Sequence, residues 1–208
     1  MTHHQLAFGL PVVGLVGGVA CGKSEVARLL AERGAAILDA DRAGHAVLRQ
    51  PEVLAAATTR WGKETLDAEG QIDRRALGQI VFSENGKPDR DFLEQLTHPR
   101  IGRLLEQQAR EHARSGGKLA VLDAPLLLEA AWDKFCSSIV FVDAPRPLRL
   151  ARARQRGWSE EEFCRREMAQ LPVDQKRRRA DLVIDNSGSL DDLRLQVEAA
   201  WSRLVGPA

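Results

Sequence analysis

Residues Gly17 to Ser24 read G-G-V-A-C-G-K-S and match the nucleotide-phosphate-binding pattern G-x-x-x-x-G-K-S/T. An apolar run precedes the motif and an amphipathic stretch follows it, which is the strand and helix context that the pattern requires. Glycines let backbone N–H groups surround the phosphates, and a helix N-terminus adds partial positive charge. We predict that Lys23 contacts the β and γ phosphates and that Ser24 ligates magnesium, so that the chain uses ATP with Mg²⁺. The predicted ATP-binding residues of this loop are Gly17, Gly18, Val19, Ala20, Cys21, Gly22, Lys23 and Ser24.

Short apolar segments rich in branched residues predict buried strands at 11–16, 35–38, 119–122, 139–142 and 182–184. Helical spacing of apolar residues predicts helices at 24–33, 51–61, 74–82, 89–114, 146–168 with a break at Gly157, and 190–204. Strands that alternate with helices imply crossover connections between parallel strands. We therefore expect an α/β fold of three layers, in which a parallel five-stranded sheet has helices on both faces.

The segment 42–117 contains predicted helices but no convincing strand. The whole chain has 208 residues, which is within the usual length of one domain. We expect a single domain with a core formed by residues 11–41 and 118–208, and a helical insertion at 42–117 that binds a substrate.

Composition excludes several classes of partner. Thirty basic residues stand against 29 acidic residues, and this net charge of +1 lacks the positive excess of a nucleic-acid binder. No uncharged apolar run approaches the roughly 20 residues of a membrane span, and no signal peptide is evident. The three cysteines form no C-x-x-C pair, which favours a reducing cytoplasm. We therefore expect a soluble cytoplasmic protein that binds neither nucleic acid nor membrane.

Two carboxylates, Asp39 and Asp41, follow the second predicted strand in the sequence L-D-A-D. The carboxyl ends of parallel strands are where α/β sheets place their chemistry. A kinase needs a group there that orients an acceptor hydroxyl and receives its proton, and aspartate is a common solution. The alternative is that one of the two merely caps the following helix. The chain has no N-K-x-D segment that would read guanine, so a nucleotide-switch GTPase is not favoured.

From about residue 13 to residue 197, the chain resembles the dephospho-CoA kinase family in the order and spacing of several segments. Besides the loop 17–24, they are D-A-D at 39–41, R-A-L-G-Q-I-V-F at 75–82, L-T-H-P at 96–99, D-A-P-L-L-L-E at 123–129, Gln170, and A-D-L-V-I-D-N-S-G-S at 180–189. The resemblance implies a P-loop kinase that phosphorylates the ribose 3′-hydroxyl of dephospho-CoA and gives coenzyme A and ADP. Its partners would be the small molecules ATP and dephospho-CoA, and a monomer is favoured.

The resemblance also implies roles for single residues. Asp41 corresponds to the family's catalytic carboxylate, which orients the acceptor hydroxyl. Asp123 ends the third predicted strand, where a carboxylate can hold magnesium or its waters, and Asn186 joins the ATP-binding residues. The implied acceptor-binding residues are Asp39, Asp41, Arg75, His98, Pro125, Leu126 and Glu129.

The family has an arginine-bearing lid, which the resemblance places at about 146–170. The residue that meets the transferring phosphoryl group would be Arg149, Arg152 or Arg156. Such an arginine contributes roughly 10³ to 10⁵ in rate by meeting the developing charge. Together with Lys23 and Asp41, these arginines are the predicted catalytic residues.

Some features have a second interpretation. Cys21 is also a candidate redox-sensitive thiol, His98 precedes a proline and is equally consistent with a turn, and the basic run 176–179 is expected to be a solvated helix face. Because the same core hosts many functions, two alternatives stay open. One is a kinase of another nucleoside or nucleotide, and the other is an ATP-binding regulatory module whose carboxylates are structural.

Overall fold

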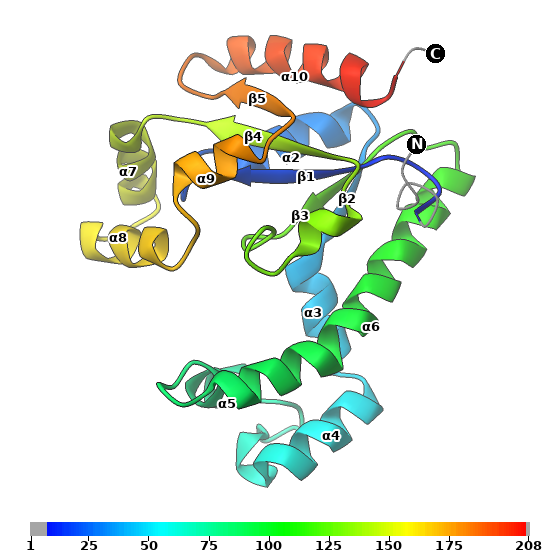
Figure 1. Ribbon diagram of the computed structural model, residues 1–208, viewed down its shortest axis with the longest axis vertical. Helices are drawn as coiled ribbons and strands as arrows, with labels where there is room; N and C mark the ends of the chain where they lie inside the picture. The colour runs from blue at the N-terminus through cyan, green and yellow to red at the C-terminus, as the bar shows by residue number, and fades with distance from the viewer. Residues whose placement is uncertain (1–7, 207–208) are drawn as a thin grey trace. The chain divides into compact units, whose positions relative to one another are not determined.

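The computed structural model describes residues 8–206 and contains a five-stranded sheet (Figure 1). The pairings of β1 with β3, of β1 with β4 and of β4 with β5 are parallel. The predicted strands are present at the expected places, and the α/β fold with a parallel sheet is confirmed. In the order β2-β3-β1-β4-β5, the strands are β2 (Ala36–Asp39), β3 (Ala120–Asp123), β1 (Val12–Gly17), β4 (Ser138–Asp143) and β5 (Leu182–Asp185).

Helices occupy every segment where helical spacing predicts one, within a few residues at each end. The predicted break at Gly157 is present, because this residue has φ 81° and separates α7 from α8. The helices are α2 (Lys23–Glu32), α3 (Ala40–Leu48), α4 (Pro51–Trp61), α5 (Arg74–Val81), α6 (Lys87–Arg114), α7 (Arg146–Gln155), α8 (Glu160–Met168), α9 (Val173–Arg178) and α10 (Leu190–Leu204), with 3₁₀ turns η1 (Lys63–Thr65) and η2 (Trp132–Phe135).

The sequence patterns did not predict α3 and α9. The segment of α3 has a glycine at position 44, which lowers helix propensity, and begins directly at the end of β2. The six residues of α9 read V-D-Q-K-R-R and contain one apolar side chain, so no helical period is visible.

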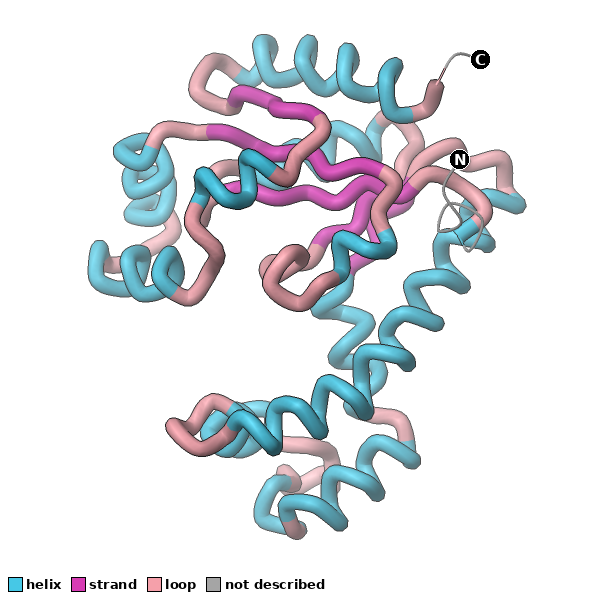
Figure 2. Tube along the Cα trace, in the orientation of Figure 1, coloured by secondary structure: helices cyan, strands magenta, loops and turns pink. Residues whose placement is uncertain are grey.

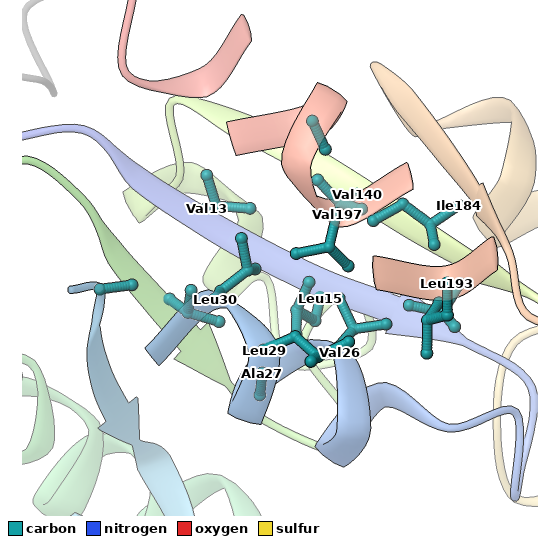
Figure 3. Close-up of a cluster of buried hydrophobic side chains, with 14 of the residues drawn as sticks. Val13, Leu15, Val26, Ala27, Leu29, Leu30, Val140, Ile184, Leu193 and Val197 are labelled. Atoms are coloured by element: carbon teal, nitrogen blue, oxygen red, sulfur yellow. The ribbon is translucent and has the colours of Figure 1, made fainter. Parts of the chain in front are cut away.

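Buried apolar side chains join the sheet to α2 and α10 (Figure 3). Val13 and Leu15 of β1 meet Val26 and Leu30 of α2, and Val197 of α10 lies in the same cluster. Full burial of each such side chain contributes about 1.5–3 kcal/mol. Alternate residues of β1 face the opposite side of the sheet. This core fixes the end of β1, from which the loop 17–24 leaves the sheet.

The described residues form two compact units. The first contains the sheet and consists of the chain up to Leu38 and from Gln107 onward, and the second is Asp39–Glu106. Figure 2 shows the second unit as helices joined by loops. Within residues 8–206, no helix is both long enough and apolar enough to cross a membrane.

In the second unit, the end of α4 contacts the start of α6. Asp89 Oδ1 accepts hydrogen bonds from Trp61 Nε1 at 2.9 Å and from Arg60 Nε at 3.0 Å. The rings of Trp61 and Phe92 meet edge to face, with centroids 5.4 Å apart. The second unit therefore has its own aromatic core.

Helix α6 continues through Pro99, so His98 lies inside a helix and the turn interpretation of this residue is wrong. Proline has no N–H for the carbonyl four residues earlier, which weakens the helix at this point. Nearby side chains supply hydrogen bonds to the helix backbone. Arg100 Nη1 donates to Leu96 O at 2.6 Å, and Thr97 Oγ1 donates to Leu93 O at 2.7 Å.

Candidate active site

The loop 17–24 leads from β1 into α2 and ends in a left-handed residue. Gly22 is the N-cap of α2 with φ 101°, and a Cβ at this position would collide with Nδ2 of Asn186. Within residues 8–206, the amides of Gly22, Lys23 and Ser24 donate no hydrogen bond to the protein. Together with the helix dipole, these amides form an anion-binding site at the start of α2.

Lys23 and Ser24 are the first two residues of α2, so the ammonium and hydroxyl groups start from the same helix turn as the amides. Lys23 is half-buried and Ser24 is exposed. The cation can therefore contact phosphate oxygens, and the hydroxyl remains accessible to a metal ion. The local chemistry is that of a polyphosphate site.

Arg152 and Asn186 hold the loop from the side of α7 and β5. Asn186 is buried, and its Nδ2 atom donates to the Cys21 carbonyl at 2.8 Å. Arg152 donates from Nη1 to the same carbonyl at 3.2 Å and from Nη2 to the Asn186 carbonyl at 2.9 Å. Three residues predicted from separate parts of the sequence are thus brought together.

Arg149 lies under the first half of the loop and is 5% exposed. Its guanidinium donates to the carbonyls of Val19 at 3.2 Å and Ala144 at 3.1 Å, and to Glu167 Oε1 at 2.6 Å. A Cβ on Gly18 would be 2.7 Å from this guanidinium. Glycine at position 18 therefore makes room for the arginine.

The predicted lid packs on the loop through a small apolar cluster of its own. Phe163 of α8 and Ala153 of α7 are buried against Val19 and Ala20. Arg156 is the C-cap of α7, where it is exposed and its side chain makes no hydrogen bond or ion pair with another described residue. Among the described residues, Arg149 and Arg152 thus donate hydrogen bonds to the loop 17–24, and Arg156 does not.

The model of the dephospho-CoA kinase family matches residues 11–192. The chain belongs to this family. Curated dephospho-CoA kinases include one from Symbiobacterium thermophilum, 41% identical over 94% of this chain and 82% of that protein, and one from Arabidopsis thaliana, 42% identical over 94% of this chain and 84% of that protein.

Solved structures show the same architecture. A crystal structure of a Thermus thermophilus protein aligns with a TM-score of 0.77 and 37% identity, over 95% of this chain and 99% of that one. The structure of the Campylobacter jejuni dephospho-CoA kinase aligns with a TM-score of 0.61 and 26% identity, over 94% of this chain and 98% of that one. The chain therefore shares the fold of a solved dephospho-CoA kinase over nearly its whole length.

The two carboxylates of the D-A-D segment, Asp39 and Asp41, lie in different environments. Asp39 is the N-cap of α3, and its Oδ1 accepts a hydrogen bond from the Arg42 amide at 2.8 Å. The capping interpretation thus holds for Asp39. Asp41 lies in the first turn of α3, is exposed, and its carboxylate has no hydrogen bond or ion pair within residues 8–206. Asp41 is therefore available to a substrate.

Glu129 was predicted to line the acceptor pocket, and its carboxylate contacts protein groups instead of remaining open. Oε1 accepts from the Leu171 amide at 2.8 Å and lies 3.0 Å from Nζ of Lys176. Lys176 is 3% exposed, and its Nζ also donates to Oε1 of Gln170 at 2.8 Å. The solvated interpretation of the basic run 176–179 is therefore wrong at Lys176.

Sequence reasoning missed Lys176 because a basic run normally indicates a solvated helix face. The neighbouring residue Arg177 stays exposed, although it pairs with Asp143 and lies over the Phe141 ring. The one signal that could have identified Lys176 is its place six residues after Gln170, which belongs to the family's landmarks.

Cys21 is 1% exposed, which leaves no accessible sulfur for the redox interpretation.

The remaining predicted residues lie at the ends of elements or in loops. Asp123 is the last residue of β3, and Pro125 and Leu126 are exposed in the loop that follows. Arg75 is the second residue of α5 and lines a pocket of about 780 Å³ in the second unit. His98 lies half-buried on α6.

Proposed function

We propose that this chain transfers the γ-phosphoryl group of ATP to the ribose 3′-hydroxyl of dephospho-CoA and thereby makes coenzyme A and ADP. The observation that carries this proposal is the match of residues 11–192 to the dephospho-CoA kinase family, with an intact phosphate-binding loop at 17–24. Two curated dephospho-CoA kinases are 41% and 42% identical to this chain, each over 94% of its length.

We assign the binding of ATP to the loop 17–24. The unpartnered amides at the start of α2 would bind the polyphosphate, and Lys23 would neutralise charge on the β and γ phosphates. Arg152 and Asn186 support this role because they hold the Cys21 carbonyl and thus the loop backbone. A loop that is already in place does not have to be ordered when ATP binds.

The donor set also fits Mg²⁺, which takes one or two protein ligands, keeps several waters and binds phosphate oxygens. The candidate ligands are the exposed hydroxyl of Ser24 and the carboxylate of Asp123, which would act directly or through water. Within residues 8–206, no cluster of three or more His, Cys, Asp or Glu side chains could hold a metal ion by itself. When bound, the ion would neutralise phosphate charge in the transition state.

On the acceptor side, we assign the role of general base to Asp41. The 3′-oxygen forms a bond to the γ-phosphorus, the bond from that phosphorus to the bridging oxygen breaks, and ADP leaves. The hydroxyl proton goes to the Asp41 carboxylate. An exposed aspartate without a protein partner is suited to this task, whereas Asp39 already serves the N-cap of α3.

Arg149, Arg152 and Arg156 stay candidates for the lid residue that meets the transferring phosphoryl group. Arg149 and Arg152 also support the loop, so their replacement should raise the KM for ATP as well as lower kcat. The Arg156 side chain makes no hydrogen bond or ion pair with a described residue, and its replacement by alanine should affect kcat alone if it meets the phosphoryl group. A fall of roughly 10³-fold or more in kcat identifies the residue.

Product analysis tests the proposed function. Incubation of the protein with dephospho-CoA, ATP and Mg²⁺ should yield coenzyme A, which mass spectrometry detects as a gain of one phosphate. ADP release with adenosine, AMP or thymidine is the comparison. A rate with dephospho-CoA no greater than with these acceptors would favour the alternative, another nucleoside or nucleotide kinase of the same fold.

Two variants test the mechanism. Asp41→Asn should lower kcat by about 10²–10⁴-fold and leave ATP binding intact, because it removes only the proton acceptor. Unchanged turnover would favour a structural role for this carboxylate. Lys23→Ala should abolish measurable transfer, and preserved transfer would contradict the role of the loop.

In the described part of the chain, Cys21, Cys136 and Cys164 are free, in keeping with a reducing cytoplasm.

A further inference from the structure

The predicted lid, residues 146–170, ends in a short connection between α8 and α9 (Figure 1). Helix α8 ends at Met168, and α9 begins at Val173. The chain thus returns from the lid to the rest of the first unit through residues 169–172. The contacts of this connection therefore decide where the lid ends.

An ion pair between Glu129 and Lys176 holds two residues of this connection. The Leu171 amide donates to Glu129 Oε1 at 2.8 Å, and Nζ of Lys176 donates to Gln170 Oε1 at 2.8 Å. Nζ of Lys176 lies 3.0 Å from the same Glu129 oxygen. Glu129, Gln170, Leu171 and Lys176 thus form an anchor that holds both the backbone and a side chain of the connection.

The loop that carries Glu129 is packed into the core of the first unit. Leu127 and Leu128, the two residues before Glu129, are buried. The Trp132 amide donates to the Leu127 carbonyl at 2.8 Å, which closes the loop on itself. The loop also follows Asp123, the candidate magnesium ligand at the end of β3. The anchor therefore joins the end of the lid to a segment whose position the core fixes.

The lid is also fastened to the phosphate-binding loop. Arg149 of α7 donates to the Val19 carbonyl at 3.2 Å and to Glu167 Oε1 of α8 at 2.6 Å, so one guanidinium joins both lid helices to this loop. Burial lowers the pKa of Lys176, Glu129 opposes this effect, and the Lys23 ammonium lowers the pKa further. Lys176 is therefore within the electrostatic field of the phosphate-binding loop as well.

Stability alone does not account for an ion pair at this place. Lys176 is 3% exposed, and Glu129 Oε2 is buried with no hydrogen-bond partner within residues 8–206. The cost of desolvating two charges often cancels their attraction, so an apolar pair of similar volume is frequently as stable. An apolar pair cannot make the directional hydrogen bonds that hold Gln170 and Leu171. The anchor is thus suited to fix a position.

We propose that Lys176 is a positioning residue for phosphoryl transfer. Through Glu129 and Gln170 it fixes the end of the lid, so that the lid arginine meets the transferring group and water is excluded from it. This inference rests on the proposed function, because it takes residues 146–170 as the lid of a phosphotransferase. Lys176 acts through these neighbours and is assigned no contact with the reacting atoms.

Separate measurement of coenzyme A and ADP tests this role at saturating substrate concentrations. Lys176→Met should lower kcat for coenzyme A formation by about 10- to 100-fold, because small displacements of catalytic groups are costly. More than one ADP should form per coenzyme A, since water reaches the γ-phosphoryl group when the lid is not seated. The assays are made at a temperature where circular dichroism shows every variant to be folded.

A charge-free double variant separates positioning from stability. Lys176→Met with Glu129→Leu strands no charge, so it should be more stable than Lys176→Met alone and still have the low kcat and the excess of ADP. Recovery of the wild-type kcat and of one ADP per coenzyme A in the double variant would show that the pair is only structural. That result would overturn the inference.

Two further variants refine the test. Gln170→Ala removes one hydrogen bond of the anchor and keeps the ion pair, so it should lower kcat about threefold with an excess of ADP. Arg178→Met is the matched control on α9. Arg178 is exposed, and its side chain makes no hydrogen bond or ion pair within residues 8–206, so this variant should change neither kcat nor the ratio of ADP to coenzyme A.

Hydrogen exchange measured by mass spectrometry distinguishes failure of this inference from failure of the proposed function. In the double variant, amides of residues 146–171 should exchange faster than in wild type, and those of α10 should not change. Unchanged exchange in 146–171 overturns the anchor, whether or not wild type makes coenzyme A. Faster exchange there, in a chain whose wild type makes no coenzyme A, supports the anchor of this segment and overturns the proposed function.

Discussion

Nζ of Lys176 lies 3.0 Å from Oε1 of Glu129, in a place where the lysine side chain is 3% exposed. The pair joins the loop that follows β3 to α9, directly after the lid. The second oxygen of Glu129 is buried and has no hydrogen-bond partner among the described residues. The pair is therefore sensitive to any change that leaves one charge alone.

Lys176→Met should destabilise the fold by about 3 kcal/mol, because it leaves the Glu129 carboxylate buried without its cation. Urea unfolding measures the effect. In the double variant Lys176→Met with Glu129→Leu, no charge is stranded, so the loss should be smaller than in the single variant. A double variant that is less stable than both single variants would show that the two side chains contribute independently, and it would contradict a cost of the stranded charge.

Stability near Glu129 should depend on pH in a defined direction. Burial alone would raise the pKa of Glu129, but the Leu171 amide and the Lys176 ammonium hold this pKa below its ordinary value of 4.5. A carboxylate with a lower pKa in the folded protein contributes stability above its unfolded pKa and loses it as pH falls through the folded pKa. Glu129→Gln should therefore flatten the loss of unfolding free energy below pH 4.5. Parallel curves for both proteins would contradict this assignment.

Lys176 should show the converse behaviour at alkaline pH. Burial lowers the pKa of Lys176 below its ordinary value of 10.5, and Glu129 opposes this effect only in part. The unfolded protein then binds the proton more tightly, so the lysine opposes folding below its folded pKa and ceases to do so as pH rises toward 10.5. The unfolding free energy of wild type, relative to Lys176→Met, should rise over this alkaline range. A difference that does not change with pH would contradict the lowered pKa.

Two glycines should respond in opposite ways to alanine. A Cβ on Gly18 would be 2.7 Å from the Arg149 guanidinium, which is buried and cannot swing away without losing its hydrogen bonds. Gly18→Ala should therefore cost about 1–3 kcal/mol. Gly78→Ala in α5 is the control, because the nearest atom would be 4.0 Å away and alanine favours a helix, so it should stabilise by about 1 kcal/mol. Thermal unfolding checks both.

Ala131 has φ 54°, a left-handed conformation that costs an L-residue about 1–2 kcal/mol. Ala131→Gly should remove part of this strain and stabilise the protein by about 1 kcal/mol. Ala130→Gly is the matched control, since its φ is not positive and glycine there only adds backbone entropy to the unfolded chain. If both glycine variants lower the unfolding free energy equally, the strain at Ala131 is not significant.

Local patterns predicted most of the fold and part of the candidate site. The strands and the loop 17–24 were predictable because their apolar runs and glycines act through local backbone preferences. Asp39 and Asp41 were recognised as a pair, but nothing in the sequence separates the capping carboxylate from the exposed one. That distinction depends on where α3 begins, and α3 begins directly at the end of β2.

The sequence alone determined the α/β class, the phosphate-binding loop and the resemblance to dephospho-CoA kinases, because each is written in contiguous residues. Only the tertiary structure decided that Lys176 is buried against Glu129, and that Arg149 and Arg152 donate hydrogen bonds to the loop 17–24. Burial and charge pairing depend on residues far apart in the chain. Their desolvation and Coulomb energies exist only once the folded chain has brought those residues together.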